Sequence, residues 1–188
     1  MTKVPNKETA EEFFGHFLTE LGFDWKSDPN MLGTPKRVSK MYIQEIFEGL
    51  YTEQPEITVF PNTENYDQLI VSRWDFSSTC SHHFLPFIGT VSIGILPGDK
   101  LLGLSKYGRV VEWFAHRPQL QENLTQQIGK HLMKLLEPRA LGVYVKAQHM
   151  CASVRGVKQH NSDMITTAVY GEMRVNASLK QEFMTSWK

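Results

Sequence analysis

The stretch "ALGVYVKAQHMC", residues 140–151, alternates apolar and other side chains in the manner of a half-buried β-strand. Successive side chains of a strand point to opposite faces, so an apolar row shares one face with His149 and Cys151 at the end of the stretch. That row consists of Leu141, Val143, Val145 and Ala147. The stretch therefore predicts a sheet with one buried face and a polar site where this strand ends.

Three further stretches have the period of a strand, and they lie on both sides of this one. They are residues 67–77, 84–96 and 164–175. Pro97 and Gly98 mark a turn after the second of them. Four strands in two hairpins are therefore expected.

Four other stretches have the apolar spacing of helices. They are residues 9–23, 34–50, 105–117 and 119–136. Thr9 and Glu12 form a capping-box pattern in the first, while Thr34 is placed to cap the second and Pro35 to occupy its first helical position. Helices, a hairpin, two more helices and a second hairpin predict an α+β fold with an antiparallel sheet.

The composition limits the class of protein. The chain has 188 residues, 41% of them hydrophobic, which fits one globular domain with at most a short appendage. Twenty Lys and Arg balance twenty Asp and Glu, so bulk charge gives no reason to expect nucleic acid or a membrane as a partner. With two cysteines, no apolar signal core and no membrane-spanning run, a reducing, cytoplasmic setting is expected.

The two cysteines define the predicted site. Cys80 and His83 are three positions apart, a spacing with which a tight turn aims two ligands at one point, and Cys151 would arrive from the strand at 140–151. Two thiolates and one imidazole suit zinc, and would also accept iron. Three protein ligands leave a fourth position for water, which is typical of catalytic rather than structural zinc sites.

Spacing alone leaves two other interpretations open. Lone cysteines of a cytosolic protein are most often small buried hydrophobes. A structural zinc site would instead be closed by a fourth ligand, either His82 or His149. In a catalytic site these two histidines are not needed as ligands, so either is available as a general acid or base.

Three cations and a Gln-Glu pair indicate what the site binds. Lys106 and Arg109 are three positions apart on a predicted helix, and with Arg155 they suggest a polyanionic, phosphate-bearing substrate. Gln121 and Glu122, at the start of the next helix, suit the donor edge of guanine. The simpler alternatives are a solvated helix face for the cations and helix capping for the pair.

Taken together, these motifs resemble those of GTP cyclohydrolase I. The resemblance lies in the runs "CSHHFLPFIG", "GLSKYGRVVEWFAHRPQLQENLTQQI", "QHMCASVRG" and "NSDMITTA", and it extends from about residue 7 nearly to the C-terminus. That family converts GTP to 7,8-dihydroneopterin triphosphate and formate by opening the imidazole ring and rearranging the ribose. The resemblance implies the first step of a pathway to folate, biopterin or a deazapurine base.

The resemblance also implies a role for each candidate residue. The ligands of one Zn²⁺ per subunit would be Cys80, His83 and Cys151. The catalytic residues would be His149 as the acid toward the purine, His82 in ring opening, and Ser105 in the sugar rearrangement. The substrate-binding residues would be Gln121 and Glu122 for guanine, and Lys106, Arg109 and Arg155 for the triphosphate.

The family fold is the tunnelling fold, a four-stranded antiparallel sheet backed by two helices. It would occupy residues 66–188 as the catalytic domain, after an N-terminal helical extension over residues 1–65, with the two forming one structural unit. The resemblance further implies a homodecamer of two stacked pentamers, with active sites built from neighbouring subunits.

Two features depart from the family pattern, and two rival functions stay open. Ser81 stands where the family usually has an acidic residue, and Asp163 and Met164 interrupt a Ser-x-Thr pattern. A nitrile reductase of the same fold would need a nucleophilic cysteine and a nicotinamide cofactor. A non-enzymatic assembly protein would use zinc only as a closed structural staple.

Overall fold

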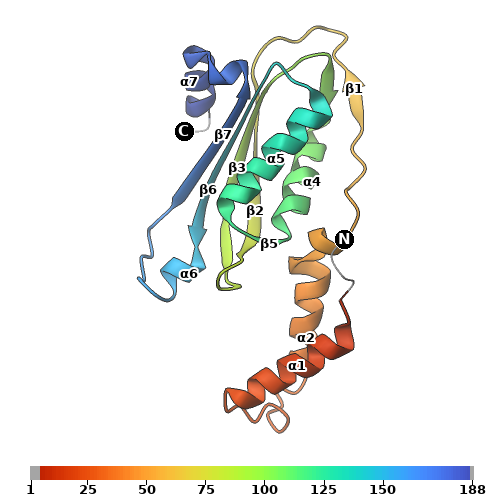
Figure 1. Ribbon diagram of the computed structural model, residues 1–188, viewed down its shortest axis with the longest axis vertical. Helices are drawn as coiled ribbons and strands as arrows, with labels where there is room; N and C mark the ends of the chain where they lie inside the picture. Colours follow the sequence, from red (N-terminus) through yellow and green to blue (C-terminus); the bar gives the residue numbers. More distant parts are fainter. Residues whose placement is uncertain (1–4, 187–188) are drawn as a thin grey trace. The chain divides into compact units, whose positions relative to one another are not determined.

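The structure is a computed structural model that describes residues 5–186. An antiparallel sheet forms the core of its larger part. Its strands are β2 (Ile70–Cys80), β3 (Pro86–Leu96), β6 (Ala140–His149) and β7 (Met164–Gly171). They pair in the order β2-β3-β6-β7, each antiparallel to the next (Figure 1). The predicted α+β fold with a four-stranded antiparallel sheet is confirmed. A two-residue strand, β5 (Pro118–Gln119), adds to the end of β2 in parallel.

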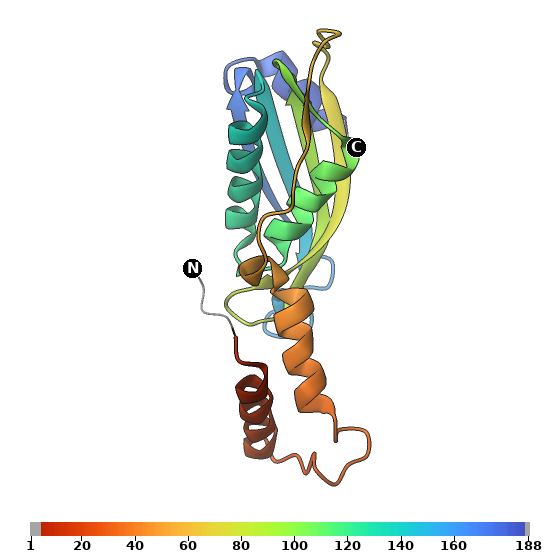
Figure 2. The ribbon, with the colours of Figure 1, turned by 90° about the vertical axis from the view of Figure 1, so that its right-hand side faces the viewer.

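Two antiparallel helices cover one face of this sheet. They are α4 (Leu104–Ala115) and α5 (Gln121–Leu136), which lie side by side on the same face in both ribbon views (Figures 1 and 2). The predicted apolar row of β6 faces them and is almost completely buried. Because the row continues toward His149, the packing that stabilises the sheet also orients the strand end that carries the site.

The opposite face of the sheet is partly covered by a C-terminal helix, α7 (Ala177–Thr185), which follows a short 3₁₀ turn, Glu172–Arg174. Phe183 of α7 is fully buried against Gly94 and Gly142, two residues paired across β3 and β6. A Cβ atom on either glycine would lie within 2.5 Å of the Phe183 ring, so only glycine admits the ring here. The helix was not predicted, and the strand expected over 164–175 ends at Gly171.

Replacing Phe183 with alanine is expected to lower the free energy of unfolding by about 3–5 kcal/mol, the usual cost of removing a buried aromatic side chain. The loss is large because the two glycines that face the ring have no side chains to fill the cavity. Denaturant unfolding followed by circular dichroism measures it. Phe60→Ala, on a residue that is 45% exposed, is the control, and an equal loss in both variants would contradict the packing described.

A second, two-stranded sheet lies in the same unit of the chain. It pairs β1 (Val59–Pro61) with β4 (Lys100–Leu102). The chain divides into two compact units, one ending at Glu53 and the other beginning at Gln54. Residues 54–65, expected in the N-terminal extension, therefore lie in the second unit, because β1 pairs with a strand of that unit.

The first unit is helical. Its elements are α1 (Lys7–Glu20), α2 (Thr34–Met41), a π-helical turn (Tyr42–Ile46) and α3 (Glu48–Tyr51). The capping-box prediction is wrong: Asn6 caps α1 by accepting a hydrogen bond from the Thr9 amide. Gly33, rather than Thr34, is the N-cap residue of α2.

The apolar stripe of α1 is only partly buried. Leu18 is buried, and Gly15 lies against the indole of Trp25, but Phe13 and Phe17 are largely exposed. Within residues 5–186, no helix combines the length and the apolar character needed to cross a membrane.

Candidate metal centre and active site

Cys80, His83 and Cys151 converge, as predicted. Their ligand atoms all lie within 4.8 Å of one another. Cys80 is the last residue of β2, and a turn closed by the Phe84 amide donating to the Cys80 carbonyl (2.9 Å) brings His83 back beside it. Phe84 has a positive φ of 55°, which lets the chain reverse within so few residues.

Cys151 reaches the same point through strand pairing. It lies in a short helical turn, α6 (Met150–Ser153), directly after β6. The pairing of β3 with β6 sets Phe87 opposite His149, so the exit of β6 lies next to the turn that follows β2. Segments far apart in the sequence thus meet at one end of the sheet (Figure 1).

The chemistry of this group fits a divalent metal ion. Burial and the neighbouring Cys80 raise the pKa of the Cys151 thiol, since two thiolates so close together repel each other. A bound cation removes that repulsion and stabilises both thiolates. The guanidinium of Arg155 lies 3.2 Å from Nε2 of His83 and donates to it, and its positive charge lowers the pKa of Cys151, against the effects of burial and of Cys80.

His149 lies two residues before Cys151, and its ring is held in one orientation. The three residues Cys80, His83 and Cys151 are called the metal group below. The His149 ring stacks on Phe87, with centroids 4.7 Å apart and planes 2° from parallel. Its Nε2 lies 2.9 Å from Oε1 of Gln121. Burial lowers the pKa of His149, while the negative charge of Glu122 raises it.

Gln121 and Glu122 begin α5 but have opposite environments. Glu122 is exposed, whereas Gln121 is completely buried. Nε2 of Gln121 lies within hydrogen-bond distance of the Val145 carbonyl (3.2 Å), the Met164 carbonyl (3.0 Å) and Oγ1 of Thr166 (3.1 Å). Gln121 therefore ties α5 to β6 and β7 and at the same time contacts His149.

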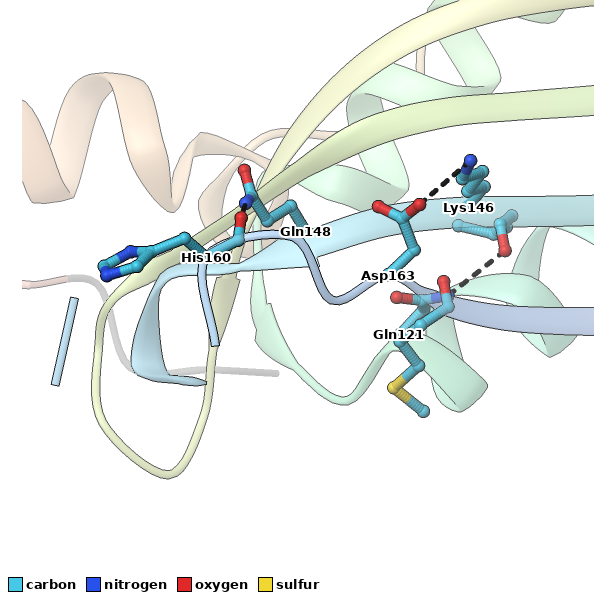
Figure 3. A network of polar contacts seen from close by, with 7 residues as sticks. Gln121, Lys146, Gln148, His160 and Asp163 are labelled. Carbon is cyan, nitrogen blue, oxygen red and sulfur yellow. Dashed lines mark hydrogen bonds and ion pairs between the residues drawn. The ribbon is translucent and has the colours of Figure 1, made fainter. Parts of the chain in front are cut away.

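The loop after Cys151, residues 154–163, carries Arg155 and is held at its end by polar contacts (Figure 3). Nζ of Lys146 lies 2.9 Å from Oδ2 of Asp163, and the Gln148 amide donates to the His160 carbonyl. Asp163, one of the departures from the family pattern, thus has a partner across the hairpin.

Ser105 and Arg109 lie in a different place. They line a groove of about 430 Å³ between β2 and α4, together with Trp74, Asp75 and Glu112. Within residues 5–186, no member of the Cys80–His83–Cys151 group lines this groove. Lys106 is half-buried in the first turn of α4, which begins at Leu104, one residue before the predicted start.

Two contributors to the site were not predicted. Phe87 supports the His149 ring, and Thr125 contacts both the Gln121 carbonyl (2.9 Å) and Oγ1 of Thr166 (2.6 Å). Phe87 could have been predicted from the alternation of β3, which places it on the same buried face as Val91. His82 is exposed in the turn, with its ring edge-on to that of His83 at 6.2 Å.

Comparison with known proteins shows the family of the chain. The family model of GTP cyclohydrolase I matches residues 10–188. GTP cyclohydrolase 1 of Shewanella oneidensis is 40% identical over 185 residues, covering 97% of this chain and 85% of that protein. GTP cyclohydrolase 1 of Brucella anthropi is 42% identical, covering 96% of this chain and 85% of that protein. A solved structure of an archaeosine synthase QueF-Like in the apo form shares 17% identity at a TM-score of 0.46, covering 55% of this chain and 93% of that one. The chain belongs to the GTP cyclohydrolase I family.

Proposed function

We propose that this chain is a zinc-dependent enzyme that hydrolyses GTP to 7,8-dihydroneopterin triphosphate and formate. The observation that carries the proposal is the convergence of two thiols and an imidazole beside an oriented histidine. Family membership supports the overall reaction. The product would enter a folate, biopterin or deazapurine pathway.

Cys80, His83 and Cys151 would hold one Zn²⁺ per subunit. When bound, zinc supplies a Lewis acid that activates water for attack on carbon 8 of the purine. Iron would fit the same ligands. Two free cysteines at this place suit a reducing compartment, so a cytoplasmic location is part of the proposal.

The histidines would move protons. Carbon 8 of guanine is a poor electrophile until nitrogen 7 is protonated, and His149 is the acid that donates this proton. His82, exposed in the turn beside His83, would exchange protons with the opening imidazole ring. Ser105 would assist the later rearrangement of the ribose.

The remaining polar residues would bind GTP. Glu122 is exposed and near His149, which suits a carboxylate that accepts from the donor edge of guanine. Lys106, Arg109 and Arg155 would hold the triphosphate, since phosphate oxygens favour cationic side chains. Gln121, the other proposed guanine-binding residue, is already engaged on both ends of its amide.

Assembly would complete the site. Arg109 and the metal group lie in separate places in one chain. The Arg109 of one subunit would therefore complete the site at the metal group of a neighbouring subunit. β5 pairs only with Thr79 and Cys80, so within residues 5–186 the sheet has an open edge along the rest of β2 and another along β7. Pairing of these edges around a ring would close both, and two stacked pentamers would form the proposed decamer.

Mixing two inactive variants tests the shared site. Cys80→Ala and Arg109→Ala are each expected to lose turnover, but co-assembled rings should recover activity in roughly one site in four, as random mixing of subunits around a ring predicts. Differently tagged subunits are co-expressed, purified through both tags and assayed. Absence of recovery in rings shown to contain both variants would contradict a site built from two subunits.

Incubation of the metal-replete protein with GTP tests the function itself. Formate and, after oxidation, a fluorescent pterin are expected in equal amounts. Oxidation of NADPH in the presence of a nitrile substrate would instead favour the reductase. Absence of both reactions from a zinc-loaded, folded sample would overturn the proposal.

A further inference from the structure

Gln121 has an unusual environment for a residue expected to bind a substrate. It is 0% exposed, and its amide nitrogen and its amide oxygen both have protein partners. We propose that Gln121 is a positioning residue, which orients the His149 ring by accepting a hydrogen bond from Nε2 and so fixes the tautomer that carries hydrogen on that nitrogen. The catalytic part of this inference rests on the function proposed above.

The orientation of the Gln121 amide follows from its neighbours. An amide nitrogen only donates, and carbonyl oxygens only accept. Nε2 faces the carbonyl oxygens of Val145 and Met164 at 3.2 and 3.0 Å. A flipped amide would set its own oxygen against these two oxygens, without a hydrogen between them, so Oε1 must be the atom that faces His149.

The state of the His149 ring follows in turn. Oε1 of Gln121 can only accept, so Nε2 of His149, 2.9 Å away, must carry a hydrogen. In the neutral ring the lone pair is then on Nδ1.

The surroundings keep this arrangement rigid. The His149 ring is stacked on Phe87, so it cannot rotate without losing that contact. Gln121 is held by two strands and by Thr166, whose hydroxyl is in turn 2.6 Å from that of Thr125 (Figure 3 shows Gln121 against these strands). A histidine oriented through one ring nitrogen by a fixed acceptor is a common device for setting the tautomer of the other.

This role differs from contact with guanine in what it predicts. A buried Gln121 whose amide is fully used has no free group for the base, which leaves recognition of the guanine edge to Glu122. Removing Gln121 should then affect the proton-transfer step and not the affinity for GTP. A guanine contact would show the opposite pattern.

The test compares Gln121→Met with Gln119→Met. Gln119 is also buried and donates through its amide, but its partners are Phe114 and Ser78 rather than His149, so it is the matched control. Gln121→Met should lower kcat for GTP by about 10- to 100-fold, the loss typical when a partner that orients a histidine is removed. Its KM for GTP and its preference for GTP over inosine triphosphate should not change, and Gln119→Met should keep the wild-type kcat.

A second measurement does not depend on turnover. In solid-state ¹⁵N spectra of histidine-labelled protein at alkaline pH, the signals lost in His149→Ala should show a protonated Nε2 and an unprotonated Nδ1. Gln121→Met should shift the ring toward a mixture of tautomers. A protonated Nδ1 in the wild type, an unchanged kcat in Gln121→Met, or a raised KM with lost base preference would each overturn the proposal. If the wild type did not convert GTP but gave the expected spectrum, the proposed function would fail and the tautomer assignment would stand.

Discussion

Cys151→Ala is expected to remove the bound metal and to reduce GTP turnover by at least about a thousandfold, because a metal centre supplies several kcal/mol of transition-state stabilisation. Cys151 is one of two thiols within 4.8 Å of His83. With only one thiol and one imidazole left, the group is too small to retain zinc. Metal content by mass spectrometry and formate release from GTP measure the two effects on one sample.

Cys80→Ala and His83→Ala should reproduce both losses, since the three residues form one group. His16→Ala, in the first unit and largely exposed, is the control and should keep metal and activity. A Cys151→Ala protein that kept stoichiometric zinc and normal turnover would show that the metal, if any, lies elsewhere.

His149→Ala is expected to keep its metal yet lose kcat by about 10²- to 10⁴-fold, the range for loss of a general acid. This combination separates a catalytic site from a closed structural one. If His149 were the fourth ligand of a zinc staple, its removal would disturb metal content or folding instead. Steady-state kinetics, metal analysis and thermal unfolding of one preparation distinguish the two outcomes.

The chain offers a matched control for this variant. His131 is also half-buried, burial lowers its pKa as it does for His149, and its ring contacts an aromatic side chain, Phe114, at 5.4 Å. It lies on α5, away from the metal group, and its Nε2 is 3.3 Å from the Gln54 amide. His131→Ala should retain kcat, so an equal loss in both variants would point to a general packing defect.

The sheet could be predicted because its strands alternate in sequence. The alternation of side chains from residue 141 onward predicted that His149 lies on the same face of the strand as the apolar row. In the structure, pairing of β6 with β3 places His149 opposite Phe87. The convergence of Cys80 with Cys151 was also predicted, although β6 ends at His149 and Cys151 lies in the helical turn that follows it rather than on the strand. The two residues meet because β2, which ends at Cys80, and β6 lie on either side of β3.

Other features depend on contacts that no periodicity encodes. The packing of Phe183 on Gly94 and Gly142 requires three segments to meet, and glycine in a strand pattern gives no sign of what fills the space above it. The N-cap of α1 is Asn6 and not the predicted Thr9. Asn6 lies before the stretch with helical spacing, so the spacing did not indicate that its side chain accepts from the Thr9 amide.

The burial of Gln121 could not be predicted from its motif. As a residue type at a helix start it suits both capping and recognition of a base, and its neighbour Glu122 is exposed as such a role requires. The Gln121 amide donates to the carbonyls of Val145 and Met164, and these lie within its reach only once β6 and β7 have paired and α5 has packed on them. The separation of Arg109 from the metal group is likewise a property of the folded chain.

X-ray absorption at the zinc edge of the purified, zinc-loaded protein tests the central claim most directly. The claim is that Cys80, His83 and Cys151 bind one ion and leave a position free for reaction. The spectrum should show two sulfurs at about 2.3 Å and a single imidazole nitrogen at about 2.0–2.1 Å from zinc. A second imidazole in the coordination sphere, or fewer than two sulfurs, would contradict it.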